Sequence, residues 1–422
     1  MSFRRGLQLA GYGLRHLGRM SRGRREVMRH LAEPATVAVP MPAFVQLRVT
    51  NLCNLRCRMC GQWGETGIYR GEAGALPTDG AAERERIRER IGLKRQMGLD
   101  TYRSLLDEIA PWKPIVSLYG GEPLLFPDIV PLVGEIKRRG MTCTMITNAW
   151  GLEEAAPGLV EAGIDAIAVS IDGPPALHDR IRGREGSFAR AAAGIEALTR
   201  ARKVRGTPEP MLLAILPVTE RNVTEIEPAL DALRELPLDT VVLGLRWFVG
   251  KEAGAAYERV MAESFGVAGS SWKGFEFEGA EFAEASSRAL EDVVRLLERV
   301  KRRRYADAAR GRPWVSFVPD VPTAGVPRYF AEPSETFGHS LCPVAWYFAQ
   351  VEPDGDVCFC GDFPDVVLGN VLERPLAQIW NGEKARVFRE KLAKEPLPIC
   401  SRCCGSWVYG KWERPAIPGR QG

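Results

Sequence analysis

Short runs rich in β-branched residues alternate with longer stretches of helical periodicity. The runs lie at residues 44–50, 115–119, 142–147, 164–171, 211–216 and 240–247. A strand followed by a helix, repeated six times, predicts βα units that form a parallel sheet with helices outside it. In barrels built this way, chemistry gathers at the C-terminal ends of the strands. The side chains that follow each run are therefore the first candidates for a functional site.

Two insertions interrupt the alternation. Residues 61–98 separate the first run from its helix, which we expect to begin with Asp100 as N-cap. Within this insertion, residues 81–91 predict a short charged helix. It is interpreted by default as a solvated face, although a long loop beside a functional site can also cover substrate. Residues 251–304 form the second insertion, which ends in an amphipathic helical pattern and is expected to lead to a C-terminal domain.

Length and composition indicate a globular protein with more than one domain. A chain of 422 residues suggests two to three domains, and 45% hydrophobic with 26% charged residues is typical of soluble proteins. There is no run of about 18 apolar residues, so no membrane-spanning helix is expected. A net charge of +4 is too small to indicate nucleic acid as a partner. We expect a reducing, cytoplasmic compartment.

The first 33 residues carry much of the positive charge, with eight arginines against Glu26 and Glu33. Apolar residues recur there at helical spacing, as in helices that lie on anionic membrane surfaces, while four glycines weaken such a helix. Peripheral membrane contact is one interpretation of this arm (residues 1–42). A solvated or loosely docked arm is another, and an organellar targeting peptide is a third.

Three cysteines lie within eight residues directly after the first run: Cys53, Cys57 and Cys60. A closed four-iron cluster needs four thiolates, so this trio would leave one iron free to bind another molecule. An odd number of cysteines cannot pair within itself, and no secretory signal favours disulfides. A structural zinc site needs four ligands, and three cysteines alone do not supply them.

Further motifs follow the next strands. Gly120-Gly121-Glu122-Pro123 follows the second run, and its glycines would let the backbone approach a ligand closely. Thr147-Asn148 and Ser170-Ile171-Asp172-Gly173 close the third and fourth runs with groups able to bind ribose hydroxyls, and 218–222 follows the fifth. For the last two motifs, helix capping is an equally good interpretation.

The cysteine trio and these motifs strongly resemble the radical S-adenosylmethionine (SAM) superfamily. The resemblance implies an α/β fold with a partial (β/α)6 barrel at residues 43–250, and a 4Fe-4S cluster whose open iron binds SAM. An electron passed into SAM then releases a 5'-deoxyadenosyl radical. The implied SAM contacts are Met59, Gly120, Gly121, Glu122, Pro123, Asn148, Ser170 and Asp172. Met59 departs from the pattern, since the family usually has an aromatic residue there.

A second group of cysteines occupies the C-terminal quarter, with Asp354-Gly355 marking a hairpin turn among them. This region (331–422, after a helical connector at 251–330) resembles the small α+β SPASM/twitch extension of radical SAM enzymes. Aligned on the family's glycine and cysteine, Cys342, Cys360, Cys400 and Cys403 would hold one auxiliary 4Fe-4S cluster. Zinc is the alternative metal, and Cys358 or Cys404 could replace a neighbour. Cys143, inside a strand, is expected in the core.

The resemblance implies an oxidoreductase or maturase. SAM-derived chemistry would abstract hydrogen from a substrate C–H bond, and the auxiliary cluster would accept the electron. Epimerisation with Cys358 or Cys404 as hydrogen donor is an alternative, as is a non-catalytic iron-sulfur or zinc protein. No acid or base can be assigned, because His16 and His30 lie in the arm. His178 and His339 are expected to be surface or capping residues.

The sequence constrains the partners less closely. A small-molecule, lipid-linked or peptide substrate is expected. The 43 residues before the first strand are too few for the leader-binding domain of many peptide-modifying relatives, which lowers the peptide interpretation without removing it. A flavodoxin or ferredoxin is the expected reducing partner.

Overall fold

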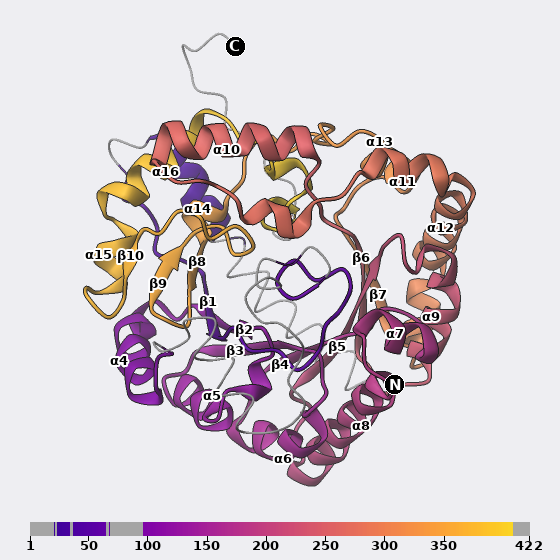
Figure 1. Cartoon of the computed structure of the whole chain (residues 1–422). Helices are drawn as coiled ribbons and strands as arrows, with labels where there is room; N and C mark the ends of the chain where they lie inside the picture. The colour runs from indigo at the N-terminus through magenta and orange to yellow at the C-terminus, as the bar shows by residue number, and fades with distance from the viewer. Residues whose placement is uncertain (1–20, 22, 34–36, 65–66, 68–95, 408–422) are drawn as a thin grey trace.

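The computed structural model describes residues 21, 23–33, 37–64, 67 and 96–407 (Figure 1). Ten strands of this part of the chain form one sheet in the order β10-β9-β8-β1-β2-β3-β4-β5-β6-β7. Seven consecutive strands are parallel: β1 (Phe44–Thr50), β2 (Ile115–Gly120), β3 (Thr142–Thr147), β4 (Ala166–Ser170), β5 (Met211–Val218), β6 (Thr240–Leu245) and β7 (Trp314–Val318). The six strands expected from the sequence are therefore confirmed, as part of a curved open barrel (Figure 1).

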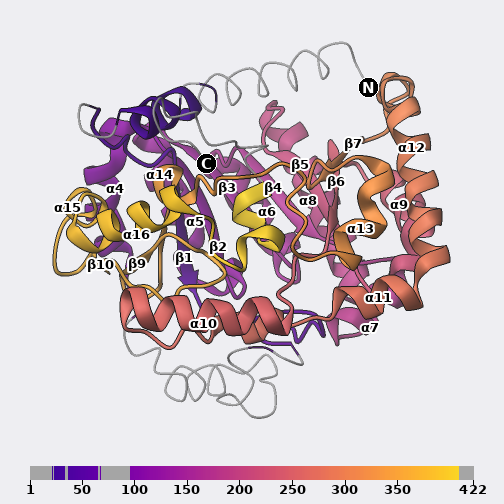
Figure 2. The same ribbon diagram turned by 90° about the horizontal axis from the view of Figure 1, so that it is seen from above.

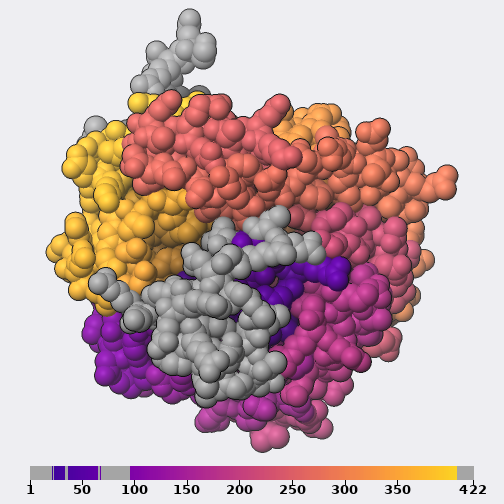
Figure 3. Space-filling view, viewed as in Figure 1, coloured from indigo at the N-terminus to yellow at the C-terminus, as the bar shows by residue number. Residues whose placement is uncertain are grey.

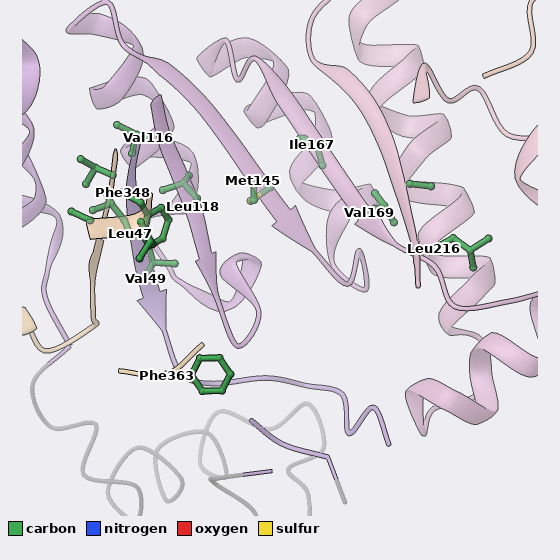
Figure 4. Close-up of a cluster of buried hydrophobic side chains, with 14 of the residues drawn as sticks. Leu47, Val49, Val116, Leu118, Met145, Ile167, Val169, Leu216, Phe348 and Phe363 are labelled. Atoms are coloured by element: carbon green, nitrogen blue, oxygen red, sulfur yellow. The ribbon is translucent and has the colours of Figure 1, made fainter. Parts of the chain in front are cut away.

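Helices cover the outside of this barrel (Figure 1). They are α4 (Leu99–Ile109), α5 (Ile129–Arg138), α6 (Leu152–Ala162), α8 (Ser187–Arg205) and α9 (Ile226–Arg234), while α7 (Pro175–Arg182) packs against α8 at the end of the barrel that faces residues 56–58. Alternate strand residues such as Val116, Met145 and Val169 are buried in the hydrophobic core, which Figure 4 shows in part. The intervening residues, such as Leu213 and Ile215 in β5, stay partly exposed, so the other face of the sheet is less tightly covered.

One helix boundary differs from the expectation. Gly98, not Asp100, is the N-cap of α4, and Asp100 lies in the first helical turn. Because glycine has no side chain, no side-chain hydrogen bond caps this end of α4. A carboxylate in the first turn still stabilises the helix through its dipole, which explains why Asp100 resembled a start signal.

The segment expected as a helical connector contributes to the sheet. It contains α10 (Lys251–Phe265), α11 (Gly279–Ala285), the long α12 (Ser287–Ala309) and α13 (Val326–Ala331), but also β7, which pairs in parallel with β6. Five residues of mixed apolar character are too short for periodicity to identify. Figure 2 shows α10 extended along one side of the molecule.

The C-terminal hairpin continues the barrel sheet. β8 (Phe348–Val351) pairs in parallel with β1, and the antiparallel β9 (Asp356–Cys358) and β10 (Gly369–Asn370) extend it. Gly355 has a φ of 92° at the turn, as the Asp-Gly signal predicts. The expected α+β character is completed by α14 (Val344–Tyr347), α15 (Leu376–Trp380), α16 (Glu383–Lys394) and α17 (Cys404–Trp407).

Part of the basic arm is docked on the core. Residues 23–32 are helical, and Val27 is fully buried. The amphipathic pattern of the first 20 residues and the charged helix expected at 81–91 lie outside the described residues, so membrane contact stays a prediction. No helix in the described ranges combines the length and apolar character needed to cross a bilayer.

Candidate functional site

The cysteine trio lies in the loop after β1, at the end of the sheet where the parallel strands terminate. All three side chains are half-buried. The amide of Cys60 donates to the carbonyl of Cys57 at 3.0 Å, and the amides of Gln62 and Trp63 point at the Cys60 sulfur at 3.4 and 3.5 Å. Hydrogen bonds to sulfur are one of the influences that set the potential of an iron-sulfur cluster. The loop therefore directs two backbone donors at the Cys60 sulfur.

Apolar side chains surround this loop. Leu52 and Trp63 are buried in a small cluster of their own, with Leu125 packed against them beside Cys53 and Cys60. The Trp63 indole donates to the carbonyl of Asn51 at 2.9 Å, which folds the loop back on its own start. An apolar shell limits water around a metal site and so affects its redox potential.

The backbone at Gly120 and Gly121 contacts the loop that carries the cysteine trio. A Cβ on Gly120 would lie 2.2 Å from the carbonyl oxygen of Thr50, and Gly120 has a φ of 153°. The amides of Gly121 and Glu122 donate to the carbonyls of Thr50 and Leu52 at 2.8 and 2.7 Å. The close approach expected from these glycines is thus made to the cysteine loop. A contact of the same backbone with SAM stays a prediction.

The Glu122 carboxylate accepts hydrogen bonds from other groups of the protein. It is buried, and it accepts from the Thr147 hydroxyl at 2.6 Å and from the amides of Asn148 and Leu124 at 2.7 and 3.1 Å. Burial raises the pKa of Glu122, and these three bonds oppose the rise. The carboxylate joins the ends of β2 and β3. Pro123 follows it, also buried, at the start of a short 3-10 turn.

Asn148 connects β3 to the trio. Its side-chain amide donates to Asn54 at 2.9 Å and lies 3.8 Å from the Cys53 sulfur, while its carbonyl oxygen accepts from the Trp150 amide at 2.9 Å. The residue predicted to contact SAM therefore reaches the cysteine loop directly.

Asp172 and Arg182 form a buried pair beside Cys57. The Asp172 side chain is fully buried, and both its oxygens accept from the Arg182 guanidinium, one of them at 3.0 Å. A further nitrogen of Arg182 lies 3.6 Å from the Cys57 sulfur. Burial raises the pKa of Cys57 to about 12, and Arg182 opposes this rise. A ribose contact through Asp172 would require this pair to open, and it stays a prediction.

Arg182 was not identified from the sequence. It is the last residue of α7, and no local motif marks it. The carbonyls of Ile181 and Arg182, free at the helix end, accept from the amides of Arg58 and Arg56 at 2.9 and 3.4 Å. The end of α7 therefore holds the cysteine loop through both backbone and side chain.

The expectation for His178 was wrong. Its side chain is fully buried, and its Nδ1 accepts from the Asp172 amide at 3.1 Å. Burial lowers the pKa of His178 to about 2, and Arg182 adds to the effect, so the imidazole is neutral at physiological pH. Its role is to position Asp172, which is neither a surface nor a helix-capping role. His339 is half-buried, near Cys342 and Cys400 in the wall of a separate cavity.

Asn222, from the motif after β5, supports the same corner. Its side-chain amide donates to the carbonyls of Asp172 and Pro217, both at 2.7 Å. Ser170 at the end of β4 and Met59 in the trio loop are both half-buried. Their proposed contacts with ribose and adenine stay predictions.

The second set of thiols also comes together. The pKa of Cys400 is raised well above its usual value by a hydrogen bond with Cys342 and by burial, then by the charges of Cys403 and Cys360. Burial raises the pKa of Cys360 likewise, followed by the charges of Cys342 and Cys403. Because these influences require proximity, the four cysteines expected to share a cluster are neighbours.

The two spare cysteines differ in position. Cys404 adjoins Cys403, and its thiol donates to the Asp362 carboxylate at 2.8 Å. Cys358 is buried, and its thiol is directed to the carbonyl of Cys360 at 3.7 Å. The charge of Cys358 nevertheless acts on Cys360, and Cys404 is hydrogen-bonded to Cys403, so the set of four ligands stays a prediction. Cys143 is fully buried in β3, which confirms it as a core residue.

A cavity of about 200 Å³ lies between the barrel and the C-terminal segment. Its wall includes Ile146, Trp247 and Phe348, together with the polar Gln46 and Asp362. The wall residues that connect it to the thiols are Tyr119, Cys342, Cys360, Cys400, Cys403 and Cys404. In Figure 3 an indigo surface, which belongs to the N-terminal part of the described chain, is visible at the centre of one face beside the magenta part of the barrel.

Tyr119 relates this cavity to both cysteine groups. Burial raises the pKa of its phenol, with further contributions from the charges of Asp362, Cys60 and Cys404. Tyr119 therefore lies within electrostatic reach of the trio as well as of the second group. The sequence contained no signal for Tyr119, Asp362 or Trp247, because the cavity exists only where β1–β3, β6 and the C-terminal segment meet.

The number of thiolates in each set fits an iron-sulfur cluster. Among the described residues, no group of three histidine, cysteine, aspartate or glutamate side chains is arranged to hold one metal ion. A tetrahedral zinc site needs its ligands around one point, whereas a four-iron cluster binds each thiolate at a different corner. Three thiolates in the first set and four in the second match an open and a closed cluster.

Comparisons with protein families agree with this assignment. The model of the radical SAM superfamily matches residues 47–233, and that of SPASM, an iron-sulfur cluster-binding domain, matches residues 342–404. The AdoMet-dependent heme synthase of Methanosarcina barkeri is 26% identical over 373 residues, which cover 86% of this chain and 87% of the relative. The PqqA peptide cyclase of Gluconobacter oxydans is 27% identical over 329 residues, covering 76% and 78%.

Solved structures share the fold at low sequence identity. The enzyme anSMEcpe with bound AdoMet superposes with a TM-score of 0.52 at 16% identity, over 89% of this chain and 86% of the other. Streptococcus suis SuiB bound to its precursor peptide SuiA gives 0.51 at 13% identity, over 90% and 76%. With its open trio, its βα barrel and its cysteine-rich extension, this chain belongs to the radical SAM superfamily and carries a C-terminal SPASM domain.

Proposed function

We propose that this protein is a radical SAM maturase that oxidises a C–H bond of its substrate. Cys53, Cys57 and Cys60 would hold a 4Fe-4S cluster, and Cys342, Cys360, Cys400 and Cys403 would hold one auxiliary 4Fe-4S cluster. The first cluster would supply the electron for reductive cleavage of SAM, and the 5' carbon of the nucleoside would then take a hydrogen atom from substrate. The auxiliary cluster would accept the second electron.

The observation that carries the proposal is the cavity between the barrel and the C-terminal segment. The auxiliary thiols form part of its wall, and Tyr119, also in the wall, lies within electrostatic reach of Cys60. An auxiliary cluster held by those thiols would occupy their side of the cavity, and a substrate group in the remaining space would lie close to an electron acceptor.

Protein groups would bind SAM around the trio. The Glu122 and Asp172 carboxylates already accept hydrogen bonds within the protein, so we assign them to positioning. The backbone at Gly120 and Gly121, the hydroxyl of Ser170 and the side chain of Met59 would then make the contacts with the amino group, ribose and adenine. A flavodoxin or ferredoxin would supply the electron.

The cavity also restricts the substrate. Its wall is mainly apolar, and the auxiliary cluster would take up part of its volume of about 200 Å³, which leaves room for a small apolar group rather than a whole large molecule. Two of the similar sequences are a heme synthase and a peptide cyclase, and the similar structure of SuiB contains a bound precursor peptide. We propose that the substrate is a peptide that inserts one apolar side chain here.

The test is SAM cleavage by anaerobically reconstituted protein. With dithionite and SAM, the wild type should release 5'-deoxyadenosine, and Cys57→Ala should release none. Cys360→Ala should still cleave SAM but fail to complete substrate oxidation. Undiminished release by Cys57→Ala would contradict the proposal.

Epimerisation is a second candidate, favoured by one observation. The Cys404 thiol lies in the cavity wall and is paired with Asp362 at 2.8 Å, a position from which it could return a hydrogen atom to substrate. Turnover in deuterated water separates the two candidates. Epimerisation would place one solvent deuterium on a product of otherwise unchanged mass, whereas oxidation yields a product lighter by two hydrogens.

A further inference from the structure

The Asp172–Arg182 pair reaches the cysteine trio from the C-terminal end of α7. Arg182 uses two nitrogens on the Asp172 carboxylate and directs a third at Cys57, 3.6 Å from its sulfur. The two residues are 0% and 7% exposed, so water cannot screen their charges. The guanidinium therefore acts on the cysteine sulfur in a medium of low dielectric constant.

Backbone contacts fix both partners. The Asp172 amide donates to His178 at 3.1 Å, and its carbonyl accepts from Asn222 at 2.7 Å. Gly183, with a φ of 71°, ends α7 directly after Arg182, and a Cβ there would lie 3.0 Å from the carbonyl oxygen of Arg56. Neither side chain can follow a change at the trio without disturbing these contacts.

A buried ion pair is by itself weak evidence for stability, because desolvation offsets its attraction. A donor or cation at a cluster sulfur has a distinct effect, since hydrogen bonds to sulfur and net charge set the reduction potential of iron-sulfur clusters. We propose that the Asp172–Arg182 pair tunes the reduction potential of the SAM-binding cluster, an inference that rests on the function proposed above. Arg182 raises the potential through Cys57, and Asp172 limits that effect by balancing its charge.

This assigns a new role to the acidic residue of Ser170-Ile171-Asp172-Gly173. The carboxylate acts on the cluster loop through Arg182, so Asp172 and Arg182 are positioning residues that need not touch SAM. The two members of the pair should shift the potential in opposite directions. A purely structural pair would instead damage the site in the same way whichever member is replaced.

The experiment is an anaerobic redox titration of the reconstituted protein, followed by electron paramagnetic resonance, with the auxiliary cluster as internal reference. Arg182→Gln removes the cation and should lower the potential of the first cluster. Asp172→Asn leaves Arg182 unbalanced and should raise it. We expect each shift to correspond to about a tenfold change in the equilibrium constant for reduction, or about 59 mV for one electron. The auxiliary potential should not move.

A matched control exists at the opposite end of the strands. Arg202 and Asp239 form another buried pair, with nitrogen and oxygen 3.0 Å apart and exposures of 8% and 4%. Asp239→Asn removes the carboxylate of an equally buried pair that does not contact the trio. It should lower stability and leave both potentials unchanged.

Shifts of the same sign, or no shift in variants that retain the cluster, would overturn the inference. If the Arg182→Gln variant loses the first cluster, the Asp172→Asn variant alone decides the question. An unchanged or lower potential of its first cluster would then contradict the inference. Loss of the first cluster in both variants likewise means a structural role. Failure of the proposed function would look different, because the wild type would then have no cluster whose signal depends on Cys57.

Discussion

Gly121 lies directly against the backbone of Leu52: a Cβ on Gly121 would be 2.2 Å from the Leu52 carbonyl oxygen. Gly121→Ala should therefore displace the loop that carries the cysteine trio, at a cost of about 2–3 kcal/mol of stability. We expect the iron content to fall by about half, since the auxiliary thiols are held by other elements. Iron analysis and thermal unfolding of the reconstituted variant would measure both effects.

Gly134→Ala is the matched control for this prediction. Gly134 lies in α5, and a Cβ there would meet nothing within 4 Å. Alanine in a helix is favoured over glycine by about 1 kcal/mol, so this variant should be as stable as the wild type or more so, with full iron content. A normal iron content in Gly121→Ala would show that the loop tolerates displacement.

Glu122→Gln tests the junction between β2 and β3. The amide of glutamine would place a donor where a carboxylate oxygen now accepts from Thr147 and Leu124 or from Asn148. A buried donor facing another donor costs about 1–3 kcal/mol. The melting temperature should fall, and SAM should bind more weakly because Asn148 loses its support. Glu154→Gln, at an exposed site in α6, should change neither quantity.

The assignment of the auxiliary ligands is testable with single serines. Cys360→Ser and Cys403→Ser should lose the auxiliary cluster, whereas Cys358→Ser and Cys404→Ser should keep it, because the proposed ligands are Cys342, Cys360, Cys400 and Cys403. Iron content and electron paramagnetic resonance would report the cluster. If Cys404→Ser lost the auxiliary cluster and Cys403→Ser kept it, Cys404 rather than Cys403 would be the cluster ligand.

His178 should make stability depend on pH. Its pKa is about 2 in the folded protein because of burial, and about 6.5 in the unfolded chain. Below pH 6.5 the unfolded chain therefore binds a proton that the folded protein does not. The resulting stabilisation is complete above pH 6.5 and is lost as the pH falls, by up to about 1.4 kcal/mol per pH unit.

His178→Gln retains an acceptor for the Asp172 amide but does not titrate in this range. Relative to this variant, the wild type should lose stability progressively between pH 6.5 and 4.5. Melting temperatures of both proteins across that range provide the measurement. Parallel curves would mean that His178 is already protonated, or is solvated, in the folded protein.

Local pattern was sufficient for much of the fold. Alternation of strand and helix predicted six parallel strands, and Asp354-Gly355 predicted a hairpin, because each signal depends on neighbouring residues. β7 was not foreseen, since five residues carry too little periodicity. The pairing of β8 with β1 was also beyond the sequence, because the two strands are separated by most of the chain.

From the sequence alone, the spacing of Cys53, Cys57 and Cys60 predicts an open set of thiolates, and the resemblance to the SPASM extension implies a second set of four. Tertiary structure alone decided how those sites are supported. Arg182 meets Cys57 across 125 residues, and Glu122 is satisfied by the end of β3. The physical reason is that ligand spacing is a local property of the chain. A buried hydrogen bond or a cavity wall, by contrast, depends on which distant elements pack together.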